Sequence, residues 1–595
     1  MYTKVKDIQI LIALMKKHHV MHVVMSAGSR HVPFVQSVET DPDFTCYSVV
    51  DERSAGYYAI GLSKALDRPV AIVCTSSTAT LNYYPAVREA ARQNIPLLVL
   101  TADRHPAYLN QLEDQMIDQP GMYGDALRKY VTLPWINSQL DSWQCQRLVN
   151  EALLELTHHG RGPVQINFPN HTNLKDNADL SVKELPGVKY IQRLTEGKQA
   201  EEWAEKAEEL KAANRILVLC GEMPHPSERL AAAIDAFAER YNCVIATEKV
   251  SNLHCKSATD TYLLSYAFDG NTFDEVRPEI VISVGGNFYS RFKALLRGKQ
   301  RRFRHWSIDE GGRVIDAFQS LNVVFESDAA GFFEYFAEQA AGKTNSQRYL
   351  KALQVRMGKI AKPAPSYSSY TVIKALTEAL PAHSLVHLSI LNSTRISQLF
   401  PFPEDVRAYS NLGTYGIDGS MSTFLGQASV TDRPSFLVIG DLSFFYDMNA
   451  LDMEKLPQNI RIVLINNGGA AEFHFSMGMK RIPTINRHIA AEHSCTAQGW
   501  LEANGFRYFR AENQEQAEQG IRELTDPGLA GPAVLEVLTR KEEDAEILNK
   551  VMDDIKLPFH GIPEVQAGSA DTENLKETGQ VKKIAKLIKR AVKGR

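Results

Sequence analysis

The stretch Phe436-Leu437-Val438-Ile439-Gly440-Asp441-Leu442-Ser443 decides the fold, because an apolar strand runs directly into a glycine and a carboxylate. A second apolar run ends in Asn466-Asn467, which places Asn467 26 positions after Asp441. This interval accommodates a helix and a return strand, so the pattern predicts a βαβ crossover. Asp441 and Asn467 should then meet at the carboxyl ends of neighbouring parallel strands, where open α/β sheets bind ligands.

These two side chains supply a carboxylate and an amide carbonyl, which are oxygen ligands that a hard divalent cation prefers. Such a cation offsets the charge of a diphosphate, and the small residues Ser443, Gly468 and Gly469 let the backbone approach phosphate groups. Gly-Asp-x followed by Asn-Asn after a helix has the form of the thiamine-diphosphate fingerprint. The pattern therefore predicts a site for thiamine diphosphate with Mg²⁺ or Mn²⁺.

A second signal lies near the N-terminus, where a strand-like run ends in Val49-Val50-Asp51-Glu52-Arg53-Ser54-Ala55. A carboxylic acid beside the ring nitrogen of the cofactor's aminopyrimidine favours its imino form, which is the base that activates the thiazolium carbon. Glu52 is the candidate for this acid. In the alternative interpretation Asp441 only caps a helix and Glu52 is a surface carboxylate, but two motifs in this order favour the cofactor.

Composition agrees with a large soluble enzyme. The 595 residues are 44% hydrophobic and 23% charged, and the length predicts about three to four domains. A net charge of −4 gives no basic field that would favour nucleic acid. The seven cysteines lack metal-site spacing, which favours free thiols. We expect a cytoplasmic protein, since the sequence shows neither a signal peptide nor an apolar run of membrane-spanning length.

Apolar strand patterns alternate with helical patterns along three segments of the chain. We predict three α/β domains with doubly wound parallel sheets over residues 1–180, 201–345 and 366–545, with a C-terminal extension at 546–595. A polar stretch at 175–198 is interpreted as a linker. Several expected strands are apolar on both faces, as in parallel sheets; they are Val20–Met25, Thr45–Val50, Val70–Cys74, Leu97–Thr101, Val164–Phe168, Ile216–Cys220, Val244–Thr247, Ile280–Val284 and Trp306–Ile308.

Several short blocks, in one order across the first 480 residues, resemble a known enzyme family. They are Ser26-Ala27-Gly28-Ser29-Arg30, Asp51-Glu52-Arg53-Ser54-Ala55, Cys74-Thr75-Ser76-Ser77-Thr78-Ala79, Leu100-Thr101-Ala102-Asp103-Arg104, Gln115-Met116-Ile117-Asp118-Gln119, Gly416-Ile417-Asp418-Gly419 and Gly440-Asp441-Leu442-Ser443. The chain resembles the thiamine-diphosphate-dependent 2-succinyl-5-enolpyruvyl-6-hydroxy-3-cyclohexene-1-carboxylate (SEPHCHC) synthases of menaquinone biosynthesis. The resemblance implies a pyrimidine-binding, a central and a diphosphate-binding domain, in a homodimer or homotetramer with active sites between subunits.

The resemblance also implies roles for particular residues. Glu52 would activate the cofactor, and Ile417 would be the apolar wedge that bends it. The metal ligands would be Asp441, Asn467 and the Gly469 carbonyl. The diphosphate would lie against Gly440, Leu442 and Ser443. Substrate oxygens would be bound by Ser29, Arg30, Arg104, Gln115 and Arg395, because the planar fork of arginine matches a carboxylate. The alternative for each arginine is a structural salt bridge.

The departures from the family pattern fall mainly on the substrate side. Leu391 replaces a serine, Leu412 replaces an arginine, and Asp114 and Glu472 replace uncharged residues. If the last three all face the pocket, its charge moves about three units toward negative, and uncompensated like charges cost several kcal/mol. We therefore expect a carboligase that decarboxylates a 2-oxo acid and uses an acceptor less anionic than isochorismate.

Three alternatives remain at this stage. The first is an authentic SEPHCHC synthase with compensating basic groups, for which Arg291, Lys293 and Arg297 are candidates. The second is a simple 2-oxo acid decarboxylase, and the third is a non-catalytic regulatory protein that binds the cofactor. In the extension, residues 581–595 carry seven basic residues beside an apolar helical stripe. That stretch could contact a membrane surface or a partner, or it could be a solubilising tail.

Overall fold

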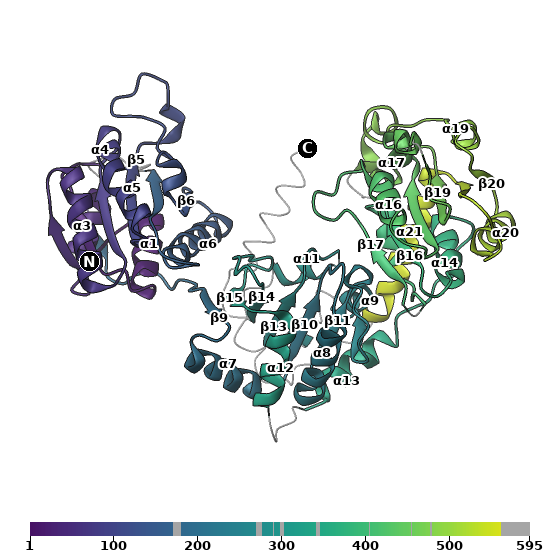
Figure 1. Ribbon diagram of the computed structural model, residues 1–595, viewed down its shortest axis with the longest axis horizontal. Coiled ribbons are helices and arrows are strands. Elements are labelled where there is room, and N and C mark those ends of the chain that lie inside the picture. The colour runs from purple at the N-terminus through teal and green to yellow at the C-terminus, as the bar shows by residue number, and fades with distance from the viewer. Residues whose placement is uncertain are drawn as a thin grey trace, which may run out of the picture.

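The computed structural model describes residues 1–169, 180–268, 276–289, 291–297, 303–340, 346–403, 405–453, 455–475 and 479–560. Figure 1 shows three α/β domains arranged as an arch, with the central domain between two outer ones. Each domain is built on one parallel sheet with helices on both faces, and the sheets have six, seven and six strands. The predicted fold class, three doubly wound parallel-sheet domains, is therefore confirmed.

The N-terminal domain has the strand order β3-β2-β4-β5-β7-β6, and every neighbouring pair is parallel. Its strands are β2 His22–Met25, β3 Thr45–Ser48, β4 Val70–Cys74, β5 Leu97–Asp103, β6 Lys129–Thr132 and β7 Val164–Pro169. One face carries α1 Lys6–Lys17, α2 Val32–Glu39 and α6 Gln139–Glu155. The other carries α3 Glu52–Leu66, α4 Thr78–Asn82 and α5 Tyr84–Arg92.

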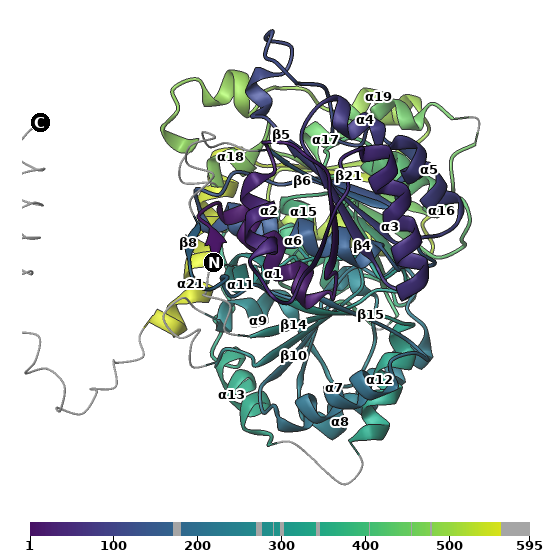
Figure 2. The same cartoon turned by 90° about the vertical axis from the view of Figure 1, so that its left-hand side faces the viewer.

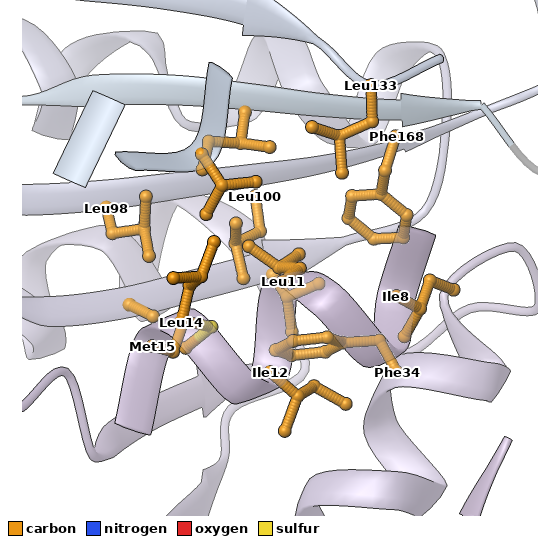
Figure 3. Packing of buried hydrophobic residues seen from close by; sticks show 14 of the residues in the cluster. Ile8, Leu11, Ile12, Leu14, Met15, Phe34, Leu98, Leu100, Leu133 and Phe168 are labelled. Carbon is orange, nitrogen blue, oxygen red and sulfur yellow. The ribbon is translucent and has the colours of Figure 1, made fainter. Parts of the chain in front are cut away.

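The apolar runs explain why the N-terminal sheet forms. Strand β4 is buried at all five positions, as expected for a strand covered by helices on both faces. Figure 3 shows the core on one of those faces, where Leu11 and Leu14 of α1 point at Leu100 of β5 and Phe34 lies nearby. This packing fixes the carboxyl edge of the sheet, from which Glu52 and the arginine-bearing loops extend.

The central domain has the strand order β12-β11-β10-β13-β14-β15-β9, again entirely parallel. Its strands are β9 Gln192–Thr195, β10 Ile216–Cys220, β11 Val244–Thr247, β12 Ala258–Asp260, β13 Ile280–Val284, β14 Arg304–Ile308 and β15 Leu321–Glu326. Helices α7 Ala200–Ala212, α8 Glu228–Tyr241 and α12 Ala329–Gln339 cover one face. Helices α9 Thr261–Ala267, α11 Phe292–Arg297 and α13 Arg348–Met357 cover the other.

The C-terminal domain has the strand order β17-β16-β18-β19-β21-β20. Its strands are β16 Leu385–Leu388, β17 Arg407–Tyr409, β18 Ser435–Gly440, β19 Ile460–Asn466, β20 Arg507–Ala511 and β21 Ala533–Leu538. One face carries α14 Ser369–Ala379, α15 Asn392–Ser397, α20 Gln514–Thr525 and α21 Lys541–His560. The other carries α16 Ser420–Ala428, α17 Asp441–Tyr446 and α19 Gln498–Ala503.

The two outer domains repeat one topology. If the six strands of each outer sheet are numbered 1 to 6 along the chain, both sheets have the spatial order 2-1-3-4-6-5. The shared strand order supports the interpretation that the two outer domains are distant structural copies. In such a sheet the order reverses beside the first strand, and the crevice at the carboxyl ends is the usual place for a ligand.

Some stretches differ from the expectation drawn from the sequence. The stretch 175–198 contains two strands, β8 Leu180–Val182 and β9, and β9 is the edge strand of the central sheet. The final helix, α21, continues past residue 545 to His560. The basic stretch 581–595 lies outside the described residues. None of the helices in the described ranges combines the length and apolarity that crossing a membrane requires, and the seven cysteines are free.

Candidate functional site

The Gly-Asp and Asn-Asn motifs meet at the carboxyl edge of the C-terminal sheet. Strand β18 ends at Gly440, α17 begins at Asp441, and the neighbouring β19 ends at Asn466. The register pairs Gly440 with Ile465, so the residues that follow the two strands are adjacent. This is the βαβ arrangement that the spacing predicted.

The Asp441 carboxylate organises the loop that follows β19. Its Oδ2 accepts hydrogen bonds from the backbone N–H groups of Asn467, Gly468 and Gly469 at 3.0, 2.8 and 3.0 Å. Its Oδ1 accepts one from the Leu442 N–H at 2.7 Å, and the side chain is almost fully buried. Charge-assisted bonds of this kind are stronger than neutral ones, so one carboxylate fixes the backbone of the whole turn.

The Asn467 side chain has one acceptor without a donor among the described residues. Its Nδ2 donates to Oδ2 of Asp544 at 3.3 Å, whereas Oδ1 is buried and makes no hydrogen bond with the described residues. Burial raises the pKa of Asp544, and bonds from Thr539 and Ser369 act against that rise. A buried amide oxygen without a donor beside a carboxylate is the environment that a hard cation completes. The residues therefore fit a divalent metal ion.

Glycine is required in the loop beside Asp441. Gly468 and Gly469 both have positive φ, +76° and +138°. A Cβ at Gly469 would lie 2.6 Å from the carbonyl oxygen of Ala490, which is backbone and cannot move aside cheaply. The loop can thus approach a phosphate group or a metal only because these positions lack side chains.

A pocket opens beside this loop, and it contains most of the predicted cofactor residues. The residues that line it include Ser389, Leu391, Ile417, Gly440, Asp441, Leu442, Ser443, Asn467, Gly469 and Glu472. The Ser443 hydroxyl donates to the Ile417 carbonyl and lies 3.1 Å from the Ser389 hydroxyl. The apolar Ile417 and the metal-type ligands therefore border the same cavity, as the resemblance implied.

Arg395 forms an ion pair with Glu472, which lines this pocket. The guanidinium donates to both carboxylate oxygens, with Nη2 2.9 Å from Oε1, and it also contacts Asn392. Arg395 lies over the ring of Phe475 at 4.7 Å. Although burial acts to lower the pKa of Arg395, the bond to Glu472 keeps it above its ordinary value. The arginine is thus held in place and already carries a carboxylate partner.

The remaining predicted residues gather on the N-terminal domain. Asp51 caps α3 by accepting from the Ser54 N–H at 2.7 Å, which places Glu52 in the first helical turn. The Glu52 carboxylate is half-buried and accepts from Nδ2 of Asn82 at 3.1 Å. Residues around it expose large apolar side chains, namely Val50, Tyr57, Tyr58, Leu81 and Tyr84.

The substrate-type residues of this domain lie on its loops. Burial lowers the pKa of Arg30, and the positive charge of Arg104 lowers it further. Arg104 forms an ion pair with Glu113. Gln115 has a positive φ of +52°, and its carbonyl accepts from the Ser76 hydroxyl. Ser29 is on the loop directly before Arg30.

The structure does not bring the two halves of the predicted site together within one chain. Glu52 belongs to the N-terminal domain and Asp441 to the C-terminal domain, which lie at opposite ends of the arch in Figure 1. The end-on view of Figure 2 superposes these domains, with the central domain below them. Within one chain, the described residues therefore form no site that contains both carboxylates.

Only one of the three positions behind the expected change in pocket charge lines the pocket. Glu472 lines the pocket. Leu412 is buried and is not part of the pocket lining, and Asp114 is exposed on the N-terminal domain. The expected shift of about three charge units is therefore too large for this chain taken alone.

Sequence reasoning missed three residues of the site. His493 Nε2 lies 3.3 Å from Oδ2 of Asp441, and Asp544 holds the Asn467 amide. Tyr289 of the central domain donates to the Leu391 carbonyl at 2.8 Å. No motif marks these positions, because each reaches the site from a segment distant in sequence.

The fold and site define a thiamine-diphosphate enzyme, and comparison with known proteins agrees. Residues 7–122 match the family described as "Thiamine pyrophosphate enzyme, N-terminal TPP binding domain". Curated proteins named SEPHCHC synthase are similar over 93% of this chain. They include those of Bacteroides thetaiotaomicron (38% identity, all of that protein covered), Bacteroides fragilis (37%, all covered) and Phocaeicola vulgatus (36%, 99% covered).

The chain therefore belongs to the SEPHCHC synthase family, and the resemblance seen in the sequence is confirmed. It is an enzyme of the carbon–carbon bond-forming type that uses thiamine diphosphate with a divalent metal ion. The alternative of a non-catalytic regulatory protein is set aside.

We expect Gly469→Ala to destabilise the C-terminal domain. The added methyl group meets the Ala490 carbonyl and the residue keeps a backbone conformation that costs about 1–3 kcal/mol. Thermal unfolding should therefore begin several degrees lower. Gly499→Ala is the matched control, because a Cβ there meets nothing within 4 Å and the residue lies in α19. Equal melting of both variants would contradict the assigned constraint.

Proposed function

We propose that this protein is a thiamine-diphosphate-dependent carboligase that decarboxylates a 2-oxo acid similar to 2-oxoglutarate and uses an acceptor with less negative charge than isochorismate. The observation that carries the proposal is the ion pair between Arg395 and Glu472, because Glu472 lines the pocket. An arginine that could bind a substrate carboxylate already binds one from its own chain.

The energetic argument concerns charge in a half-buried site. If a substrate carboxylate replaced Glu472 on Arg395, the freed Glu472 would remain in the same pocket as a like charge. Breaking a buried pair so that one charge is left uncompensated costs about 3–5 kcal/mol. A neutral or weakly anionic acceptor avoids that cost. The Arg104–Glu113 pair also supports a less anionic acceptor, since this second candidate arginine has an acidic partner too.

The geometry of the C-terminal pocket supports the cofactor roles that the family resemblance implies. Asp441, Asn467 and the Gly469 carbonyl would hold the metal, and Gly440, Leu442 and Ser443 would flank the diphosphate. Ile417 would support the bend between the two rings. When bound there, thiamine diphosphate would supply a nucleophilic carbon and an electron sink for decarboxylation of the 2-oxo acid.

Glu52 would be supplied by a second subunit. In its protonated form the Glu52 carboxyl group would donate a hydrogen bond to the aminopyrimidine ring nitrogen, and Ser29, Arg30 and Gln115 on the same domain would approach the substrate. The apolar side chains exposed around Glu52 support burial of this face between subunits in a homodimer or homotetramer. Residues 1–180, 201–345 and 366–545 would then be the pyrimidine-binding, central and diphosphate-binding domains.

Authentic SEPHCHC synthesis is the second candidate, because the relatives at 36–38% identity carry that name over nearly the whole chain. Basic groups of the central domain could then compensate for Glu472. Arg291 lies over the ring of Tyr266 at 4.3 Å, and burial lowers the pKa of Lys293.

A substrate screen separates these functions. Purified protein with thiamine diphosphate and Mg²⁺ should release CO₂ from 2-oxoglutarate, or from another 2-oxo acid, without consuming isochorismate. Coupled consumption of 2-oxoglutarate and isochorismate at equal rates would instead establish the second candidate. Full-rate aldehyde release with no dependence on any acceptor would identify a simple decarboxylase.

Glu472→Gln tests the ion pair directly. The change frees Arg395, so kcat/KM for isochorismate should rise at least about tenfold, which corresponds to about 1.4 kcal/mol. Glu512→Gln is the control, because it removes a comparable partner from Arg510 on the surface of the same domain. An unchanged kcat/KM in Glu472→Gln, measured by product formation, would contradict the charge argument.

Mixing two inactive variants tests whether the site forms between subunits. Glu52→Gln and Asn467→Ala should each abolish turnover. Chains mixed after dissociation and reassociation should recover about a quarter of the original activity, because half of the dimers then contain one intact site of two. No recovery, with mixed dimers demonstrated by mass spectrometry, would mean that both residues act within one chain.

A further inference from the structure

We propose that His158, His159 and Glu326 bind a divalent transition-metal ion such as Zn²⁺ where the N-terminal and central domains meet. The two histidines follow α6, and Glu326 is the last residue of β15. Figure 1 places α6 beside the β9–β15 edge of the central sheet, away from the C-terminal pocket. The proposed site is therefore separate from that of the magnesium-type ion and does not depend on the proposed function.

The ligand atoms already have the spacing that a small ion needs. One atom from each residue lies within 4.8 Å of the other two. Glu326 Oε1 is 2.9 Å from His159 Nε2 and 3.5 Å from His158 Nε2. Tetrahedral Zn²⁺ with bonds of about 2.0–2.1 Å requires neighbouring ligand atoms about 3.3 Å apart. The two measured distances bracket that value, so small movements complete the geometry.

The surroundings orient each ligand toward the common centre. His158 Nδ1 lies 3.1 Å from a Glu155 oxygen, whereas its Nε2 is buried and makes no hydrogen bond with the described residues. A proton on Nδ1 leaves the Nε2 lone pair directed at Glu326. Thr195 donates to the other Glu326 oxygen at 3.1 Å. Carboxylate–histidine–metal arrangements of this kind are the usual support of zinc ligands.

A glycine keeps the centre of the cluster open. Gly312 has a φ of +64°, and a Cβ there would lie 3.0 Å from His158 Nε2 and 3.1 Å from the Glu326 carboxyl carbon. Its carbonyl accepts from Arg193 Nε at 2.8 Å. The backbone therefore passes close to the ligands without filling the space between them.

The neighbouring charges leave the Glu326 carboxylate available to a cation. The Arg193 guanidinium pairs with Glu155 at 2.8 Å, and the Arg128 guanidinium donates to the backbone carbonyls of Glu155 and His158. Neither arginine bonds to the Glu326 oxygen that faces the two histidines in the part of the chain that the structure describes. Imidazole nitrogens favour Zn²⁺ over Mg²⁺, so the magnesium of the cofactor site does not compete effectively. His159 is 61% exposed along its side chain, which leaves a route for entry and a position for water.

Equilibrium dialysis of the untagged holoenzyme against Zn²⁺, with excess Mg²⁺ and thiamine diphosphate, tests the proposal. We expect one tightly bound Zn²⁺ per chain, counted by mass spectrometry, and its loss in His159→Gln. His19→Gln is the matched control, because His18-His19 also follows a helix but has no carboxylate at the equivalent place. Equal zinc content in wild type and His159→Gln would overturn the proposal.

A second measurement keeps the test independent of folding defects. His159 is on the surface, and circular dichroism should show its variant folded. Zn²⁺ should raise the melting temperature of wild type but not of His159→Gln, because the ion joins two domains. Glu155→Gln should weaken Zn²⁺ binding by about 10–100-fold, as loss of a supporting carboxylate does. Unchanged affinity in Glu155→Gln together with no thermal shift in wild type would reject the site.

Discussion

The Asp441 carboxylate is the interaction on which the cofactor half of the site depends. It accepts N–H groups from Asn467, Gly468 and Gly469, and so ties the end of β19 to the end of β18. This bonding positions Asn467 with its amide oxygen free of donors. Without it, four N–H groups would lose their acceptor, including that of Leu442. The same geometry forces glycine at 469, where any side chain would meet the backbone.

The two outer domains share one topology, and each carries one of the two sets of predicted site residues. Both sheets have the same strand order, and each presents functional side chains at its carboxyl edge. The central domain holds these edges apart at the ends of the arch. Tyr262 and Tyr266 of α9 are part of the C-terminal core, whereas Trp143 bonds Asp316 across the other boundary. The separation is therefore built into the packing of the chain.

Much of the fold could be predicted because parallel strands that are covered on both faces consist of consecutive apolar residues, as β4 and β18 do. The meeting of Asp441 and Asn467 was predictable for a related reason, since a βαβ unit fixes which strand ends are neighbours. Strand β9 was missed because its sequence, Gln192–Thr195, is mostly polar and forms an edge. Pairs such as Arg395–Glu472, 77 positions apart, depend on tertiary packing that periodicity does not encode.

The placement of Glu472 bears on how substrate charge is balanced in this family member. A fixed arginine beside the pocket usually provides a binding site for an anion, but here the counter-ion belongs to the protein and is attached through α18 (Ala471–Phe475). Its effective concentration at Arg395 is therefore high, and a free carboxylate has to compete with an intramolecular partner. Arg104, paired with Glu113, would impose the same competition on the N-terminal set of predicted residues. Under the proposed function, pairing within the chain would select against highly charged acceptors, while both arginines would remain able to orient hydroxyl or carbonyl groups.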